Sequence, residues 1–241
     1  MLDPRDAALQ GSLPCVVVPK FGVLLPMPSD HRGMRLLVAR GGLYVQIQLD
    51  WLRATVCIQP LACRPPLPYG ELRESICFTF GVIPVALLEA FIAAGRAALP
   101  NEIAGALVYS RSTGSLRLVL HEAIATGPAR VHYRLPRLAS HECLAVDLHT
   151  HGHLRADWSA TDDEDDQGIK VAGVFGDLDQ PGHESPSAAF RLVVNGFFKD
   201  LPHPWIKRRT ANEIGAVDPS TTWPTLDALG FRSLEDAAWS T

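Results

Sequence analysis

The segment HTHGHLRADWSATDDEDD, residues 149–166, places three histidines and a serine ahead of a run of acidic residues. His149 and His151 end the apolar run Cys143–His151, which we predict to be a strand. Because successive side chains of a strand point to opposite faces, the two imidazoles share one face. A catalytic zinc site uses three protein ligands. The strand end therefore offers two ligands of a metal site and needs a third from a neighbouring element.

The acidic run offers that third ligand, but it also has a structural interpretation. Ser159 followed by Asp162 is a helix N-terminal capping pattern, so the segment is predicted to open a helix. The further acidic residues would favour the positive end of that helix. Considered alone, Ser159 and Asp162 are better explained as helix caps than as parts of a metal site.

The complete spacing is more specific than either half. The pattern consists of five residues, namely Glu102, His149, His151, Ser159 and Asp162. It resembles the JAMM (MPN/JAB) metalloprotease family, whose signature is a glutamate well upstream of H-x-H-x(7)-S-x-x-D. The lead-in NEIAGALVYS resembles the E-x-x-G segment that follows a helix in that family, and the resemblance covers roughly Ile83–Phe198.

The resemblance implies a role for each residue of the pattern. His149, His151 and Asp162 would bind Zn²⁺ and leave a fourth position for water. Glu102 would take the water's proton as general base, and Ser159 would donate a hydrogen bond to the oxyanion. The implied reaction is metal-assisted hydrolysis of an amide. In the family, this is the isopeptide or C-terminal peptide bond of ubiquitin or a ubiquitin-like protein, as in a deubiquitinase.

A narrower resemblance concerns the segments outside this pattern. The β-rich leader with LPYG and the later VNGFF resemble the bacterial PRTRC-system protein A group. That group implies a processing or deconjugating peptidase, with a ubiquitin-like protein or its conjugates and activating-enzyme-like proteins as partners. The chain departs from the family at Gly152, where a proline usually follows the second histidine, and we expect a looser turn there.

Two other functions remain open at this point. A non-catalytic MPN-type scaffold would bind a protein partner, although such members commonly lose metal ligands. Another metal hydrolase with an HxH pair, such as an amidohydrolase or a phosphoesterase, would need further ligands at later strand ends. The segment VAGVFGDLD offers only Asp177 and Asp179 for that purpose.

Several neighbouring residues have predictions of their own. His153 is expected to face solvent beyond the strand end. Asp147 could orient a ligand imidazole or be a buried hydrogen-bonded aspartate, with neither favoured. Trp158 is expected to make an apolar contact, and residues 163–166 are interpreted as a solvated helix start. The histidines without ligand spacing are given no role, and these are His121, His132, His141, His183 and His203.

The surrounding sequence predicts an α+β fold. Apolar residues at helical spacing predict a helix within Ile83–Asn101, the most clearly marked element. Strand-like runs are Glu102–Ser110, Ser115–Ala123, Cys143–His151, Lys170–Leu178 and Ala188–Phe198. They lack a regular βαβ rhythm, so we expect a mixed or antiparallel central sheet flanked by helices. The resemblance implies the MPN/JAB-like, cytidine-deaminase-like version of this fold.

Three regions are expected along the chain. Residues 1–80 form a β-rich N-terminal extension with a hairpin at Gly41-Gly42 and a stiff proline-rich loop or linker at Cys63–Gly70. Residues 81–200 form the JAMM/MPN metalloprotease core. Residues 201–241 form a C-terminal tail with one short helix within TLDALGFRSLEDAAW.

Composition excludes several classes of protein. The 241 residues carry 22 Lys+Arg against 26 Asp+Glu, without a basic stripe, so no nucleic-acid partner is expected and Lys207–Arg209 is interpreted as a solvated turn. No apolar run reaches the roughly 20 residues of a membrane span, and we expect no signal peptide and no membrane partner. The five scattered cysteines form no CxxC pair, which favours a reducing, cytoplasmic location.

Overall fold

The computed structural model describes residues 4–62, 64–127, 130–134, 136–180 and 186–202. These residues form two compact units, one ending at Gly81 and the other beginning at Val82. The predicted helix within residues 225–239, the basic turn at Lys207–Arg209, His183 and His203 lie outside the described residues. Among the helices that are described, none is both long and apolar enough to cross a membrane.

In its described residues, the first unit consists of a five-stranded sheet and one short helix. Its strands lie in the order β1-β2-β3-β4-β5, with β1 parallel to β2 and the other neighbours antiparallel. The elements are α1 (Pro4–Ser12), β1 (Cys15–Val17), β2 (Gly33–Ala39), β3 (Gly42–Gln48), β4 (Leu52–Pro60) and β5 (Ser75–Phe78). The hairpin predicted at Gly41-Gly42 is confirmed, because β2 and β3 pair up to Ala39 and Gly42.

The described part of the proline-rich segment, residues 64–70, ends beside the first strands of this sheet. The Gly70 N–H donates to the Val18 carbonyl, and the Gly70 carbonyl accepts from Arg40 N–H, at 3.0 and 2.9 Å. The segment therefore ends as a loop of the first unit.

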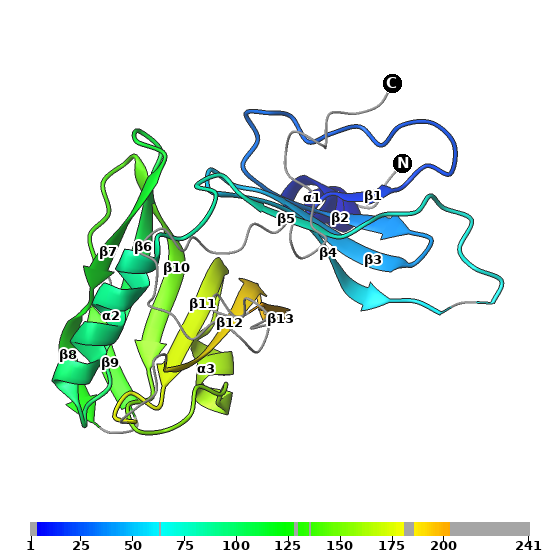
Figure 1. The fold of residues 1–241 in the computed structure, drawn as a ribbon. Helices are drawn as coiled ribbons and strands as arrows, with labels where there is room; N and C mark the ends of the chain where they lie inside the picture. Colours follow the sequence, from blue (N-terminus) through cyan, green and yellow to red (C-terminus); the bar gives the residue numbers. More distant parts are fainter. Residues whose placement is uncertain (1–3, 63, 128–129, 135, 181–185, 203–241) are drawn as a thin grey trace, which may run out of the picture. The chain divides into compact units, whose positions relative to one another are not determined.

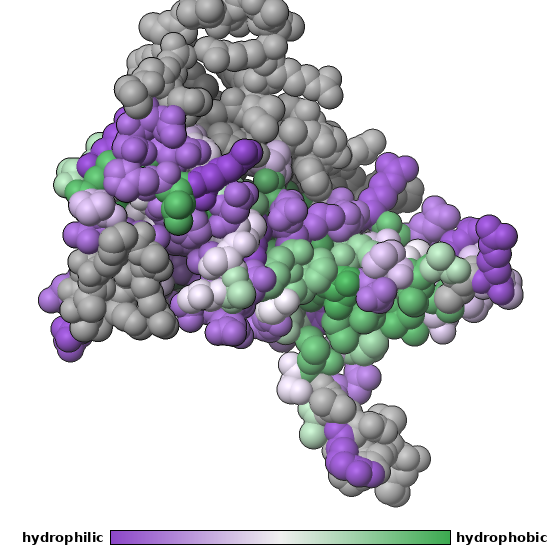
Figure 2. Space-filling model, turned by 90° about the horizontal axis from the view of Figure 1, so that it is seen from below, coloured by the Kyte–Doolittle hydropathy of each residue, from purple (hydrophilic) through white to green (hydrophobic). Residues whose placement is uncertain are grey.

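Figure 2 shows a continuous hydrophobic area bordered by hydrophilic residues. Large apolar side chains exposed in the first unit are Val17, Phe21, Val23, Leu25 and Leu61.

The second unit contains a six-stranded mixed sheet (Figure 1). Its order is β13-β12-β11-β10-β6-β7, with β10 parallel to β11 and the other neighbours antiparallel. The strands are β6 (Ala104–Ser110), β7 (Ser115–Leu120), β10 (Glu142–Thr150), β11 (Ile169–Gly176), β12 (Ser187–Val194) and β13 (Phe197–Leu201), beside a hairpin of β8 (Glu122–Gly127) and β9 (Arg130–Arg134). The predicted α+β class with a mixed sheet is confirmed.

Within the described part of this unit, helices α2 (Val85–Ala98) and α3 (Ala160–Asp165) contact the sheet. The helix predicted within Ile83–Asn101 is confirmed as α2, which buries Leu88, Phe91, Ile92 and Gly95. The Phe91 ring packs on Phe175 of β11, with centroids 5.8 Å apart. α3 instead contacts Arg191, whose register partner on β11 is Ala172. Because Ala172 and Phe175 point to opposite faces, the two helices lie on opposite sides of the sheet.

Two predicted strands are in fact interrupted, one by a turn and the other where the chain passes from one sheet to the next. The run Ala188–Phe198 folds into β12 and β13, because Asn195 and Gly196 adopt φ of 47° and 85°, the left-handed conformation of a two-residue hairpin turn. The run Ser115–Ala123 likewise ends at Leu120, and β8 begins at Glu122. Apolar content predicted strand conformation correctly in both runs, but it did not reveal the reversal at Asn195-Gly196 or the change of sheet after Leu120.

Candidate metal centre

The end of β10 is held on both sides by backbone hydrogen bonds. On one side, His151 N–H donates to the Phe175 carbonyl at 2.8 Å. On the other, Thr150 N–H donates to the Ile103 carbonyl at 3.0 Å, and the Ile103 N–H returns a 3.0 Å bond to Thr150 Oγ1. These bonds fix the directions of the flanking imidazoles and tie the segment that carries Glu102 to the same strand end.

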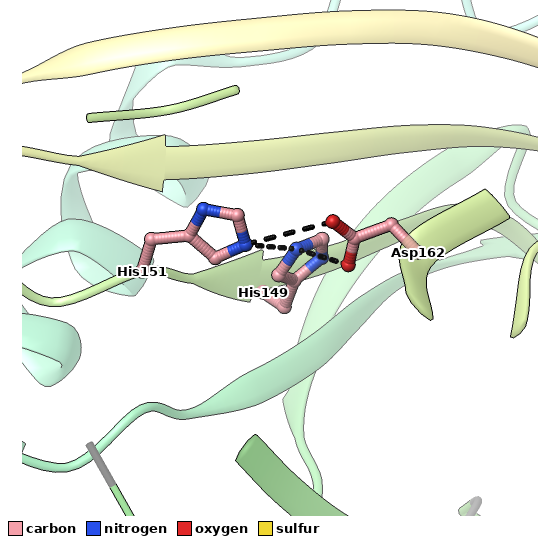
Figure 3. Close-up of side chains that lie close together, drawn as sticks. All are labelled: His149, His151 and Asp162. Atoms are coloured by element: carbon pink, nitrogen blue, oxygen red, sulfur yellow. Dashed lines mark hydrogen bonds and ion pairs between the residues drawn. The ribbon is translucent and has the colours of Figure 1, made fainter. Parts of the chain in front are cut away.

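His149, His151 and Asp162 point toward one another at this strand end (Figure 3). The two histidine Nε2 atoms are 3.2 Å apart, His149 Nε2 is 3.1 Å from Asp162 Oδ1, and His151 Nε2 is 3.7 Å from Asp162 Oδ2. Ligands bound at 2.0–2.1 Å to a tetrahedral zinc ion lie about 3.3 Å from one another. The three donors therefore have the separation and the chemical types that fit a single metal ion.

Helix α3 begins with the predicted cap. Ser159 Oγ accepts a 3.2 Å bond from Asp162 N–H, while the Ser159 backbone N–H and hydroxyl both donate to Asp162 Oδ2 at 2.7 Å. The prediction that Ser159 caps a helix with Asp162 at its third position is confirmed. The capping box is therefore compatible with both interpretations of Ser159 and Asp162, as a helix cap and as part of a metal site, because it orients the same carboxylate that faces the histidines.

The protonation of the group suits metal binding. Burial alone would raise the pKa of Asp162, but hydrogen bonds from His149 and Ser159 outweigh it and hold that pKa well below its usual range. Burial and the neighbouring His149 lower the pKa of His151, with Asp162 acting in the opposite direction. An ionised carboxylate and a neutral imidazole are the forms that coordinate a cation.

Glu102 is a buried carboxyl group beside this cluster. It lies two residues before Ala104, whose register partner on β10 is His149, and only 6% of it is exposed. Burial raises its pKa to about 7, Asp162 adds to the increase, and His149 opposes it. A carboxyl group that titrates near neutral pH can both accept and release a proton, as a general base must.

The neighbouring acids and histidine are paired away from the cluster. His153 is 51% exposed, as predicted, and its Nδ1 lies 2.8 Å from Asp179 Oδ2. Asp147 Oδ2 accepts a 2.7 Å bond from Lys170 Nζ, so of its two alternatives the buried hydrogen-bonded aspartate is the one observed. Among the residues that the structure describes, the cluster that could hold a metal consists of His149, His151 and Asp162.

Gly152 forms a tight turn, contrary to the prediction that it is loose. Its φ is 56°, and its carbonyl accepts a 3.0 Å bond from Leu178 N–H. Proline, the usual residue of the family here, has φ fixed near −65° and could not adopt this conformation. Glycine therefore permits a different turn, which the neighbouring Leu178 segment holds in place.

Three features of the site were not identified from the sequence. Thr150, which stands between the two histidines in the sequence, is fully buried, and its hydroxyl accepts a bond from the Ile103 N–H next to Glu102. The prediction that residues 163–166 are solvated is wrong for Asp166, which is 7% exposed and bonded to Arg191. Arg191 itself lies on β12, and only strand register brings it under α3.

The mixed sheet and the three donor side chains at the end of β10 define a domain that could bind a metal ion. A family model described as prokaryotic homologs of the JAB domain matches residues 84–193, and one described as a domain of unknown function (DUF2016) matches residues 3–79. Residues 84–193 therefore belong to the JAB/MPN family, which confirms that resemblance. This family includes metalloproteases.

Two further comparisons complete this picture. Among curated proteins, none matches the chain. A solution structure of protein DSY2949 from Desulfitobacterium hafniense is similar at 17% identity and a TM-score of 0.38, covering 49% of this chain and 88% of that one.

Proposed function

We propose that this protein is a zinc-dependent metallopeptidase that hydrolyses an isopeptide or C-terminal peptide bond of a ubiquitin-like protein. The observation that carries the proposal is the convergence of His149, His151 and Asp162 beside the buried Glu102. Membership of the JAB/MPN family supports a hydrolytic use of such a cluster. The substrate class and the PRTRC-type partners, including activating-enzyme-like proteins, rest on the resemblance in sequence.

Each side chain has a defined task in the proposed reaction. His149, His151 and Asp162 would hold a zinc ion, which would act as a Lewis acid toward a water molecule and the amide carbonyl. Glu102, with its pKa raised to about 7, accepts the proton of the attacking water and passes it to the leaving amine. Ser159 Oγ–H, which donates to Asp162, would turn to the oxyanion as charge develops there.

Metal content tests the binding half of the proposal. Elemental analysis of protein purified without added metal should give near one zinc per chain for the wild type. His149→Ala and Asp162→Ala should each retain little, because each removes one of three ligands. His153→Ala is the matched control and should keep the wild-type content, since His153 pairs with Asp179 instead. Negligible zinc in the wild type, even after zinc is supplied, would contradict the proposal.

Cleavage tests the catalytic half. A ubiquitin-like protein, extended by a C-terminal peptide or joined to a lysine side chain, should be cut by the wild type. Glu102→Gln should bind zinc and cut at least 100-fold more slowly. A zinc-loaded wild type that binds these proteins without cutting them would favour the scaffold function. Hydrolysis of small amides or phosphoesters alone would favour the other metal hydrolase.

A further inference from the structure

Helix α3 carries Asp162, yet it lacks an apolar anchor. All of its residues are described, and none of them is buried. A six-residue helix is too short to be stable by itself, and most helices gain stability by packing an apolar face. Other contacts must therefore keep the Asp162 carboxylate opposite His149 and His151.

Arg191 of β12 makes those contacts from beneath the helix. Its side chain is only 3% exposed. Nε and Nη2 donate to Asp166 Oδ2 at 3.0 and 2.7 Å, and Nη1 donates to Asp163 Oδ1 at 2.5 Å. Asp163 directly follows Asp162, and Asp166 caps the end of α3. The planar guanidinium therefore holds the helix at Asp163 and Asp166, which lie one and four residues after the candidate ligand Asp162.

The same guanidinium is held between two aromatic rings. Its central carbon lies 3.9 Å from the ring centroids of both Trp158 and Phe198. Trp158 directly precedes the cap residue Ser159, and its ring centroid lies 6.2 Å from that of His149. Arg191 thus contacts the segment before the helix as well as its end. Stacking and hydrogen bonding together leave the side chain with one orientation.

Lys170 extends this network to the strand of the histidines. Its ammonium lies 2.9 Å from Asp166 Oδ1 and 2.7 Å from Asp147 Oδ2. Asp147 stands two residues before His149 on β10, so a continuous chain of ion pairs joins β12, α3 and β10. Buried ion pairs add little net stability, but their geometry is specific. Their main effect here is to define where α3 sits.

We propose that Arg191 is a positioning residue of the metal centre, which sets the place of Asp162 relative to the two histidines. This inference rests on the metal centre proposed above. Replacing Arg191 would leave Asp166 buried beside fewer cations, and α3 would shift toward water to solvate it. Because Asp162 lies on that helix, the shift would change the ligand geometry directly.

The test compares metal binding by Arg191→Met and Arg191→Lys with the wild type. Zinc affinity is measured by competition with a chromophoric chelator, and coordination geometry by the visible absorption of the Co²⁺-loaded protein. Arg191→Met should weaken zinc binding by about 10–100-fold, the typical effect of removing an outer support of a ligand. Arg191→Lys keeps the charge without the planar fork, so its loss should be smaller. Both should alter the Co²⁺ spectrum.

Arg117→Met is the matched control. Arg117 lies on β7 of the same sheet and makes a similar two-point contact with Glu142, at 2.7 and 2.9 Å, without touching α3. Its zinc affinity and Co²⁺ spectrum should equal those of the wild type. If Arg191→Met matched Arg117→Met in both measurements, the positioning role would be overturned.

Two further measurements distinguish a variant that fails to fold from one that has lost only the positioning role of Arg191. The melting temperature of each metal-free variant shows whether it folds. If Arg191→Met does not, Asp163→Asn removes one exposed partner of Arg191 and should still weaken zinc binding. Wild-type affinity in both Asp163→Asn and Arg191→Lys would overturn the inference. A wild type that binds no zinc overturns the proposed function together with it, whereas one that binds zinc but cuts nothing affects the proposed function alone.

Discussion

Helices α2 and α3 lie on opposite faces of one sheet and are held by different forces. α2 has 14 residues and buries Leu88, Phe91, Ile92 and Gly95. α3 has six residues, all described, and buries none. Apolar burial is strong but non-directional, whereas ion pairs and hydrogen bonds are weaker in net energy and specific in geometry. We infer that α2 stabilises the domain and that the contacts of α3 define the site.

The largest expected effect is on the α2 side. Phe91→Ala removes a fully buried ring of α2 that packs on Phe175, and should lower the free energy of unfolding by about 3–5 kcal/mol. Chemical denaturation followed by circular dichroism measures this loss. Glu89→Ala, at an exposed position of the same helix, should change the free energy by less than about 0.5 kcal/mol. If Phe91→Ala weakened zinc binding by the folded protein more than Arg191→Met does, the division between the two helices would be wrong.

A smaller effect on the free energy of unfolding is expected from replacing Glu102, which is buried beside the candidate metal centre. Its pKa is raised from 4.5 to about 7, so folding disfavours its ionised form. Below pH 4.5, Glu102 is protonated in both the folded and the unfolded protein and does not lower the free energy of unfolding. As the pH rises from 4.5 toward 7, the unfolded chain releases this proton while the folded protein retains it, so the free energy of unfolding falls. At 1.36 kcal/mol per unit, the loss above pH 7 is at most about 3 kcal/mol. Glu102→Gln should therefore be more stable than the wild type at pH 8, with little difference at pH 4.5.

Urea denaturation of the metal-free protein at both pH values measures this difference. Metal must be absent, because a bound cation favours the ionised carboxylate. Glu89→Gln is the control and should show the pH dependence of the wild type, since that position is exposed on α2. An equal change in stability at pH 4.5 and pH 8 for Glu102→Gln would mean that burial does not raise this pKa.

The smallest expected loss of stability comes from the cap of α3. Ser159→Ala removes the hydroxyl that accepts from Asp162 N–H and donates to its carboxylate, at a cost of about 1 kcal/mol. Zinc affinity should also fall, because Asp162 loses a bond that orients it. Thr161→Ala, at an exposed position of the same helix, should leave both quantities unchanged. Loss of stability with wild-type zinc affinity in Ser159→Ala would separate the cap from the metal centre.

Features encoded by local periodicity were predictable from the sequence. Leu88, Phe91, Ile92 and Gly95 recur at helical spacing, so α2 and its buried face could be derived from one short segment. The alternation that places His149 and His151 on one face needs only the strand conformation. The hairpin at Asn195-Gly196 was also encoded locally, but a continuous apolar run was interpreted as a single strand.

Features that depend on strand register were not predictable in this way. Asp166 belongs to an acidic run that looks solvated, and it is buried because Arg191 reaches it from β12. Thr150 gains its role only when the Ile103 segment lies beside β10. In both cases, the burial of a polar side chain is decided by a partner far away in the chain.

The sequence by itself determined the types and spacing of the donors, the JAB/MPN family and the apolar helix that supports the sheet. Those properties are local, because periodicity and capping patterns are set by neighbouring residues. Only the tertiary structure decided that Glu102 is buried beside His149 and that Arg191 and Lys170 hold α3 in place. The physical reason is that burial and ion pairing depend on which strands become neighbours, and this is fixed when the whole sheet assembles.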